Sequence, residues 1–204
     1  MAKVLMERDP AAFMRRLDNH ERDFRRLLAL DLATSTGVAI ADVVPGRRED
    51  ISMLLSQWDL RIGDYDASVL RFLRLKAFLT VVKPDFIILE DCRFTGTNET
   101  QGRNISAIVA RAVTGAEFLG GLKVTVVTWA EERKIPVQAV GSGQLKKAAT
   151  GKGNASKEEM IRACNAQFGT DFDPKDYEKT GVDNIADAAH LLKIGLDYYA
   201  EALA

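Results

Sequence analysis

The sequence LLALDLATSTGVAIAD, at residues 27–42, contains the pattern from which the architecture can be inferred. Residues 27–32 are apolar except for Asp31, residues 34–37 are typical of a turn, and the apolar pattern then resumes. This pattern predicts two strands joined by a tight turn, which is a β-hairpin. Residues 51–60 offer a third strand of similar length.

Beyond the hairpin, helical and extended patterns alternate. Apolar residues recur at helical spacing over residues 66–82, and this helix should end at Lys83 because Pro84 disfavours helical geometry in the residue before it. Residues 86–90 are typical of a buried strand, which we expect to be parallel to the first strand. This order predicts one α/β domain with a mixed central sheet flanked by helices.

The rest of the chain is mainly helical in pattern. The expected elements are a helix at 104–134 with Gly115 and the pair Gly120–Gly121 as bends or close-packing points, a strand at 136–140, a helix at 142–149, a helix opened by a capping box of Ser156 and Glu159, a polar loop at 169–182 and a last helix at 183–203. At the other end, residues 11–26 have a helical pattern. We therefore expect residues 1–26 to form a helical N-terminal extension and residues 27–204 to form the main domain.

Composition excludes several classes of protein. Hydrophobic residues make up 47% and charged residues 28% of the 204, so a disordered or collagen-like chain is excluded. No apolar run approaches the ~20 residues of a membrane helix, and the N-terminus has no apolar core of a secretory signal. Cys92 and Cys164 lack CxxC spacing, so neither a zinc site nor a disulfide framework is expected. These features favour a cytoplasmic protein.

Charge is balanced overall but uneven along the chain. There are 28 basic and 29 acidic residues, so net charge by itself gives no indication of a nucleic-acid partner. Residues 141–164 carry a local charge of +3, and residues 165–204 carry −5. A basic segment beside an acidic one suits a polyanion site next to metal-binding carboxylates, although chance clustering on a solvated surface would look the same. The candidate DNA contacts in the basic segment are Lys146, Lys147, Lys152 and Lys157.

Four acidic residues stand at positions suited to a metal site. Asp31 lies inside an apolar strand, where a charge is costly unless it is paired or bound to a metal. Glu90 ends the second buried strand, where open α/β sheets tend to bind ligands. Asp183 and Asp187 are four residues apart at the start of the last helix, so both lie on one face. If they converge, these carboxylates suit Mg²⁺ or Mn²⁺; alternatively, Asp183 is an N-cap, and Glu90 and Asp187 face solvent.

These residues resemble a known family. The segments that carry the resemblance are ALDLATSTGVAI at 29–40, IILED at 87–91, LKKAATGKGNASKEEM at 145–160 and DNIADAAHLL at 183–192. Together they resemble the RuvC-type Holliday junction resolvases (crossover junction endodeoxyribonucleases) of bacteria and their phages, from residue 27 to the last helix. The resemblance implies a ribonuclease H-like fold, a homodimer, and metal-dependent hydrolysis of phosphodiesters in four-way DNA junctions.

Carried over residue by residue, the resemblance assigns roles to the four carboxylates. Asp31, Glu90 and Asp187 match three metal-binding carboxylates of the family. The fourth precedes the last aspartate by three residues in the bacterial resolvases, and this chain has Asn184 there. Asp183 resembles the DN-x-x-D variant of phage-like members, so the resemblance gives it the ligand role.

The resemblance also implies contacts to DNA. Lys146 and Lys157 align with basic residues that the family places close to the scissile phosphate, although both could be solvated helix lysines. The glycines of the loop at 150–154 let backbone amides approach a phosphate. Phe94 stands one residue away from the family's junction-probing aromatic, and it could instead be a packed loop residue.

The implied mechanism is two-metal hydrolysis. Two Mg²⁺ ions about 3.5–4 Å apart, for which Mn²⁺ would substitute, activate a water and neutralise the phosphate. Asp31 is expected to bridge the ions, and Lys157 or Lys146 to stabilise the developing negative charge. The alternatives are a broader nuclease for flaps and forks and a non-catalytic junction-binding protein. A remote alternative is an actin-like ATPase or sugar kinase, whose phosphate-binding turn DLATSTG resembles, but those proteins generally carry a duplicated core.

Overall fold

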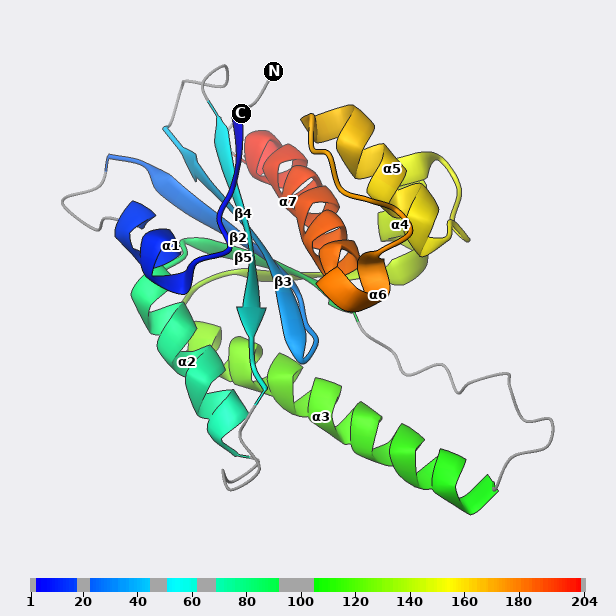
Figure 1. Cartoon of the computed structure of the whole chain (residues 1–204). Helices are drawn as coiled ribbons and strands as arrows, with labels where there is room; N and C mark the ends of the chain where they lie inside the picture. The colour runs from blue at the N-terminus through cyan, green and yellow to red at the C-terminus, as the bar shows by residue number, and fades with distance from the viewer. Residues whose placement is uncertain (1–2, 18–22, 45–50, 62–68, 92–104, 203–204) are drawn as a thin grey trace.

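The structure is a computed structural model, and it describes residues 3–17, 23–44, 51–61, 69–91 and 105–202. Within these ranges, a six-stranded sheet carries helices on both faces (Figure 1). Its strand order is β1-β4-β3-β2-β5-β6. The strands are β1 (Lys3–Met6), β2 (Arg25–Asp31), β3 (Ser35–Val43), β4 (Ser52–Asp59), β5 (Phe86–Asp91) and β6 (Val137–Gly141).

The sheet is mixed, as the sequence predicts. β2 and β3 form the expected antiparallel hairpin, and β4 pairs antiparallel with β3. β5 is parallel to β2, which confirms the prediction for residues 86–90, and β6 is parallel to β5. Parallel neighbours bring their C-terminal ends to one edge of the sheet, and this arrangement positions the candidate site.

The helices form the two outer layers. They are α1 (Pro10–Arg16), α2 (Leu70–Val82), α3 (Ile105–Glu131), α4 (Ser142–Thr150), α5 (Lys157–Phe168), α6 (Tyr177–Thr180) and α7 (Val182–Ala202). The predicted capping box opens α5: the Ser156 side chain accepts from the Glu159 amide, and the Glu159 carboxylate accepts from the Ser156 amide. α2 ends at Lys83, immediately before Pro84, as predicted.

Alternation along the strands divides the core into two layers. In β2, Leu27 and Ala29 pack with residues of α4, α5 and α7, whereas Leu28 and Leu30 pack with residues of α1, α2 and α3. Figure 1 shows the same division, with α7 lying along one face of the sheet and α2 and α3 on the other. None of the helices in the described ranges has the length and apolar character that crossing a membrane requires.

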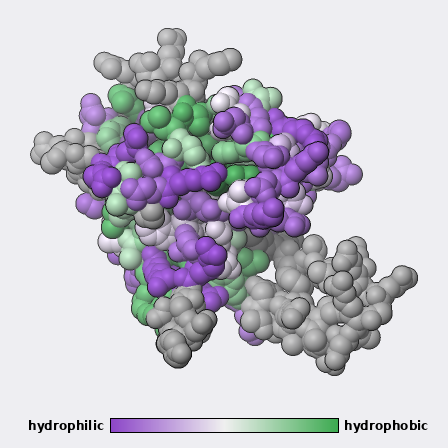
Figure 2. All heavy atoms as spheres, viewed as in Figure 1, coloured by the Kyte–Doolittle hydropathy of each residue, from purple (hydrophilic) through white to green (hydrophobic). Residues whose placement is uncertain are grey.

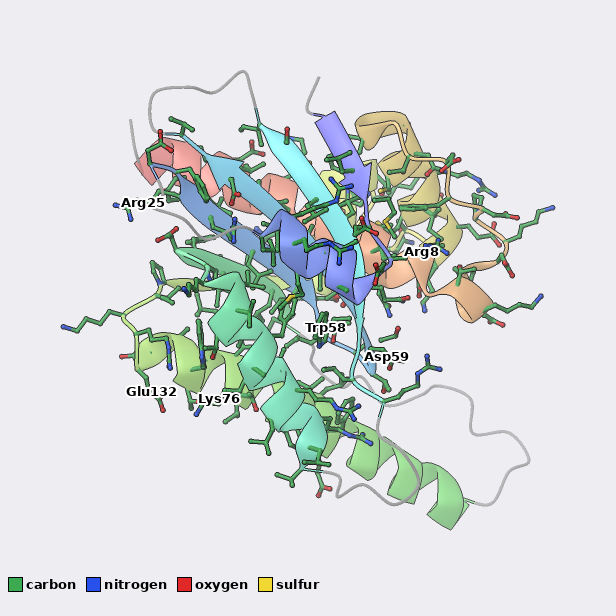
Figure 3. The ribbon with its side chains drawn as sticks, turned by 60° about the vertical axis from the view of Figure 1, so that its left-hand side comes forward. Arg8, Arg25, Trp58, Asp59, Lys76 and Glu132 are labelled. Carbon is green, nitrogen blue, oxygen red and sulfur yellow. The ribbon has the colours of Figure 1, made fainter. Side chains whose placement is uncertain are left out.

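The N-terminal region differs from the predicted helix over residues 11–26. It contains strand β1, which pairs parallel to β4 at the sheet edge, and the shorter helix α1; residue 25 already belongs to β2. Phe13 of α1 is fully buried and stacks on Phe78, and Trp58 lies against both rings. Figure 3 shows Trp58 on β4 pointing toward this layer. The sequence did not predict β1 or the short extent of α1, because this region is rich in charged residues and both elements pack against segments that are distant in the sequence.

Two other elements differ from expectation. The loop at 169–182 contains the short helix α6, which ends at Gly181 with φ of +66°. α3 is a continuous helix of 27 residues, so its glycines do not interrupt it. Gly121 is nevertheless a close-packing point, because a Cβ there would lie 2.7 Å from Cε1 of Phe72.

Candidate active site

Two of the candidate carboxylates lie side by side at the C-terminal ends of neighbouring parallel strands. The register pairs Leu30 of β2 with Leu89 of β5, and Asp31 and Glu90 are the next residues on these parallel strands. Asp31 shares the alternation of Ala29 and therefore faces α7 rather than α2 and α3. Asp31 is buried, and Glu90 is half-buried.

The first turns of α7 carry the other two carboxylates to the same place. Asp183 is buried, and Asp187 lies one turn further along the helix. α7 is held there by a close approach to β3: the Asn184 side-chain amide donates to the Ser35 carbonyl at 2.7 Å. A Cβ on Gly37 would lie only 1.9 Å from the Asn184 carbonyl oxygen, so this approach requires glycine at position 37.

The carboxylates influence one another electrostatically. Burial raises the pKa of Asp31 well above its usual value, and the negative charges of Asp187, Glu90 and Asp183 raise it further. Burial, followed by the charges of Glu90 and Asp183, raises the pKa of Asp187 to about 7. For Asp31 and Asp187, burial and the neighbouring negative charges therefore favour the protonated form, and a cation bound nearby would favour the charged form.

The donor set fits a hard divalent cation. All four groups offer carboxylate oxygens, which Mg²⁺ and Mn²⁺ prefer. Asp187 supplies an unpartnered acceptor, since its Oδ1 atom is buried and, within the described residues, has no hydrogen-bond partner. The carboxylates do not form a complete metal-binding site, however. In the part of the chain that the structure describes, no three His, Cys, Asp or Glu residues are placed to hold an ion.

Two of the predicted lysines reach this site. Lys157, the first residue of α5, donates from Nζ to Asp183 Oδ2 at 2.5 Å. Lys146 of α4 lies close enough to Asp187 to lower the pKa of that carboxyl, against the larger effect of burial. α4 follows directly from β6 at the same edge of the sheet, which explains how Lys146 comes near the carboxylates.

The other predicted DNA contacts are placed differently. Lys147 is an exposed residue of α4, and Lys152 is paired with Glu159 at 2.9 Å in the loop before α5. Phe94 lies outside the described residues. Figure 2 shows that hydrophilic side chains gather over the lobe formed by α4, α5 and the segment around α6. The basic segment thus lies on the polar lobe beside the carboxylates.

Sequence reasoning missed Tyr177, which lies at the start of α6. Its ring centroid is 5.2 Å from Nζ of Lys157, a distance typical of a cation–π contact. Tyr177 belongs to the stretch that the sequence indicates only as a polar loop, and no motif marks it. Lys123 of α3 also pairs with Asp91, next to Glu90, and this contact between distant segments likewise had no local signal.

Comparison with known proteins identifies the fold. No protein-family model matches the sequence, and no curated protein matches it. The chain is similar to the structure of Thermus thermophilus RuvC in complex with a Holliday junction substrate, with a TM-score of 0.56 and 22% identity over 82% of this chain and 90% of that one. A second Thermus thermophilus RuvC structure gives a TM-score of 0.52 and 20% identity, over 83% of this chain and 96% of that one.

A third structure is the yeast mitochondrial Holliday junction resolvase Ydc2, with a TM-score of 0.49, 16% identity, and coverage of 89% of this chain and 82% of that one. At these identities the similarity to RuvC concerns the fold. The six-stranded mixed sheet with helices on both faces is therefore the ribonuclease H-like fold that Thermus thermophilus RuvC has.

Proposed function

We propose that this chain is a metal-dependent endonuclease that hydrolyses phosphodiesters in branched DNA, with the four-way junction as its substrate. The proposal is supported by the placement of Asp31 and Glu90 at the ends of neighbouring parallel strands, with the start of α7 beside them and Lys157 bonded to Asp183. Phosphodiester hydrolysis needs this combination, because metal ligands and cations must act on the same phosphate. A binding surface for DNA alone gains nothing from buried acids.

The residues that would hold two Mg²⁺ ions, for which Mn²⁺ would substitute, are Asp31, Glu90, Asp183 and Asp187. When bound, the metal ions supply a water of lowered pKa and neutralise phosphate charge. Asp183 is favoured over Asn184 as the fourth ligand because the Asn184 amide is engaged with the Ser35 carbonyl.

The chain's other residues would bind and orient the DNA. Lys157 or Lys146 would stabilise the negative charge that develops on the phosphate. Lys147 and Lys152 would contact the DNA backbone from the polar lobe, and Phe94 is proposed to probe the junction. Two strands of a junction are cut symmetrically, so we propose a homodimer with two active sites.

Support for the junction as substrate comes from the fold. The similar Thermus thermophilus RuvC structure was determined with a Holliday junction substrate. Fold similarity does not fix substrate, so a nuclease that also cuts flaps and forks is the competing function. A junction-specific nuclease and a flap or fork nuclease would need the same carboxylates and would differ only in which branched DNA they cut.

Cleavage of a labelled four-way junction, beside linear duplex and flap DNA, tests this proposal. With Mg²⁺ we expect paired, symmetric nicks in the junction and none with EDTA. Asp31→Asn should lower cleavage at least ~1,000-fold and leave junction binding intact, because it removes a metal ligand rather than a DNA contact. Asp197→Asn, an exposed residue of α7, is the matched control and should cut normally.

Three other outcomes of this experiment would change the proposal. Equal cutting of flaps would make the chain a general branched-DNA nuclease. Tight junction binding without cleavage would make it an architectural protein. Full activity of Asp31→Asn with Mg²⁺ would contradict the site itself.

A further inference from the structure

Lys157 stands at an unfavourable place for a cation. It is the first residue of α5, where the helix dipole and the unpaired amides favour negative charge. The capping box of Ser156 and Glu159 fixes this helix start, so the backbone of Lys157 is held firmly. The two acidic residues of the first turn are engaged elsewhere, Glu158 with Arg162 and Glu159 with Lys152. A lysine in this position needs a compensating anion.

Asp183 supplies that anion. The two charges meet at 2.5 Å, and the side chains differ sharply in exposure: 60% for Lys157 and 9% for Asp183. The aspartate is therefore the fixed member of the pair, and the lysine can leave toward solvent. Burial alone would lower the pKa of Lys157, but the hydrogen bond and the attraction to Asp183 outweigh burial and raise it.

The bond is made to an oxygen that the proposed metal site requires. Asp183 Oδ2 accepts from the ammonium, so a divalent cation and Lys157 cannot both occupy this position. While it is bonded to Asp183, the ammonium also has a favourable contact with the ring of Tyr177.

We propose that Lys157 is an internal counter-ion that occupies the metal-binding oxygen of Asp183 and must be displaced before a divalent cation binds there. The inference rests on the proposed function, since it assigns Asp183 to the metal. Displacement couples two events: the cation enters the carboxylate cluster, and the lysine becomes available to a substrate phosphate. Tyr177 is then a positioning residue, which acts through Lys157.

Mn²⁺ binding to the full chain without DNA, measured by the loss of the free-Mn²⁺ EPR signal, tests this competition. Lys157→Met should bind Mn²⁺ about ten-fold more tightly than the wild type, because no ammonium has to be displaced. In EDTA the same variant should unfold at lower urea, since Asp183 is left buried without a partner, and Mn²⁺ should restore its stability. Lys157 is largely exposed, so the variant is expected to fold.

Two controls separate displacement from a general change of charge. Lys146→Met removes one positive charge near Asp187 but does not free the Asp183 oxygen. Any gain in its Mn²⁺ affinity is therefore a long-range charge effect, which high salt should screen. The gain in Mn²⁺ affinity of Lys157→Met should persist in high salt. Lys193→Met, whose charge is paired with Asp197 on α7, should bind Mn²⁺ as the wild type does. Tyr177→Phe keeps the ring and should leave the affinity unchanged, whereas Tyr177→Leu should raise it about two-fold by weakening the resting place of the lysine.

The outcomes distinguish this inference from the proposed function. Equal or weaker Mn²⁺ binding by Lys157→Met, when the wild type binds Mn²⁺ and Asp187→Asn does not, overturns the inference and leaves the metal site standing. Equal gains for the Lys157 and Lys146 variants at every salt concentration also overturn it. Failure of every variant and of the wild type to bind Mn²⁺ overturns the proposed function, and the inference with it.

Discussion

At the scale of single residues, the raised pKa of Asp187, a proposed metal ligand, makes the free energy of unfolding depend on pH. Its pKa is raised from 3.8 to about 7, first by burial and then by the charges of Glu90 and Asp183. The unfolded chain gives up this proton near pH 4, and the folded chain keeps it until about pH 7. The folded state therefore binds more protons in this window, and the free energy of unfolding falls as the pH rises through it.

Asp187→Asn should consequently stabilise the metal-free protein at pH 8 by about 2–4 kcal/mol and change little at pH 4, where the wild-type carboxyl is already neutral in the folded state. Urea unfolding in EDTA at the two pH values measures this difference. The same variant should bind Mn²⁺ far more weakly. Asp197→Asn on the exposed face of α7 should shift neither quantity. Destabilisation of Asp187→Asn at pH 8 would mean that the carboxylate supports the fold instead of the metal.

At the scale of elements, the contact between β3 and α7 sets the geometry of the site. Gly37 leaves room for the Asn184 carbonyl, and a Cβ would meet it at 1.9 Å. The Asn184 carbonyl belongs to the backbone, and a Cβ is fixed directly to the backbone of residue 37, so neither group can rotate away. A side chain at position 37 must therefore push the start of α7, with Asp183 and Asp187, off the end of β2.

Gly37→Ala should destabilise the protein by about 1–3 kcal/mol, the usual range for overpacking, and should also weaken Mn²⁺ binding. Gly120→Ala is the matched control, because a Cβ at that helical position meets nothing within 4 Å. It should be neutral or stabilising by up to about 1 kcal/mol, since alanine favours a helix more than glycine does. Thermal unfolding and Mn²⁺ titration measure both effects. A Gly37→Ala protein with unchanged Mn²⁺ affinity would show that the start of α7 tolerates displacement.

The elements that could be predicted from sequence are those whose signal is local. The hairpin at 27–42, the capping box at Ser156 and the helix end at Lys83 depend on neighbouring residues, and all three are confirmed. β1 could not be predicted, because four residues carry little pattern and its partner β4 lies about fifty residues away. α6 was hidden for a similar reason, since it is a single turn of polar residues.

The same difference between local and long-range signals applies to the candidate site. The motif positions of Asp31, Glu90, Asp183 and Asp187 could be found in the sequence, and parallel pairing of β2 with β5 explains why the first two lie together. The contacts that organise these residues could not be found, because they join distant segments. Lys157 reaches Asp183 across 26 positions, and Asn184 reaches Ser35 across 149. Their roles in metal and DNA binding stay predictions.

At the scale of the whole molecule, the N-terminal segment is built into the sheet that carries the site. β1 extends the sheet beyond β4, and α1 inserts Phe13 and Leu17 into the core layer formed with α2 and α3. The nuclease activity proposed for residues 27–204 should therefore depend on residues 3–17. Removal of a core aromatic from this segment should lower the stability of the entire domain rather than loosen one end.

Phe13→Ala tests this dependence. Phe13 is fully buried against Phe78 and Trp58, so its truncation should cost about 3–5 kcal/mol. Because the core is shared, tryptophan fluorescence and far-ultraviolet circular dichroism should report the same lowered urea midpoint. Arg15→Ala on the exposed face of α1 should change the free energy of unfolding by less than about 0.5 kcal/mol. An unchanged global midpoint for Phe13→Ala would instead make residues 3–17 a separable arm, whose deletion should leave Mn²⁺ binding by the four carboxylates intact.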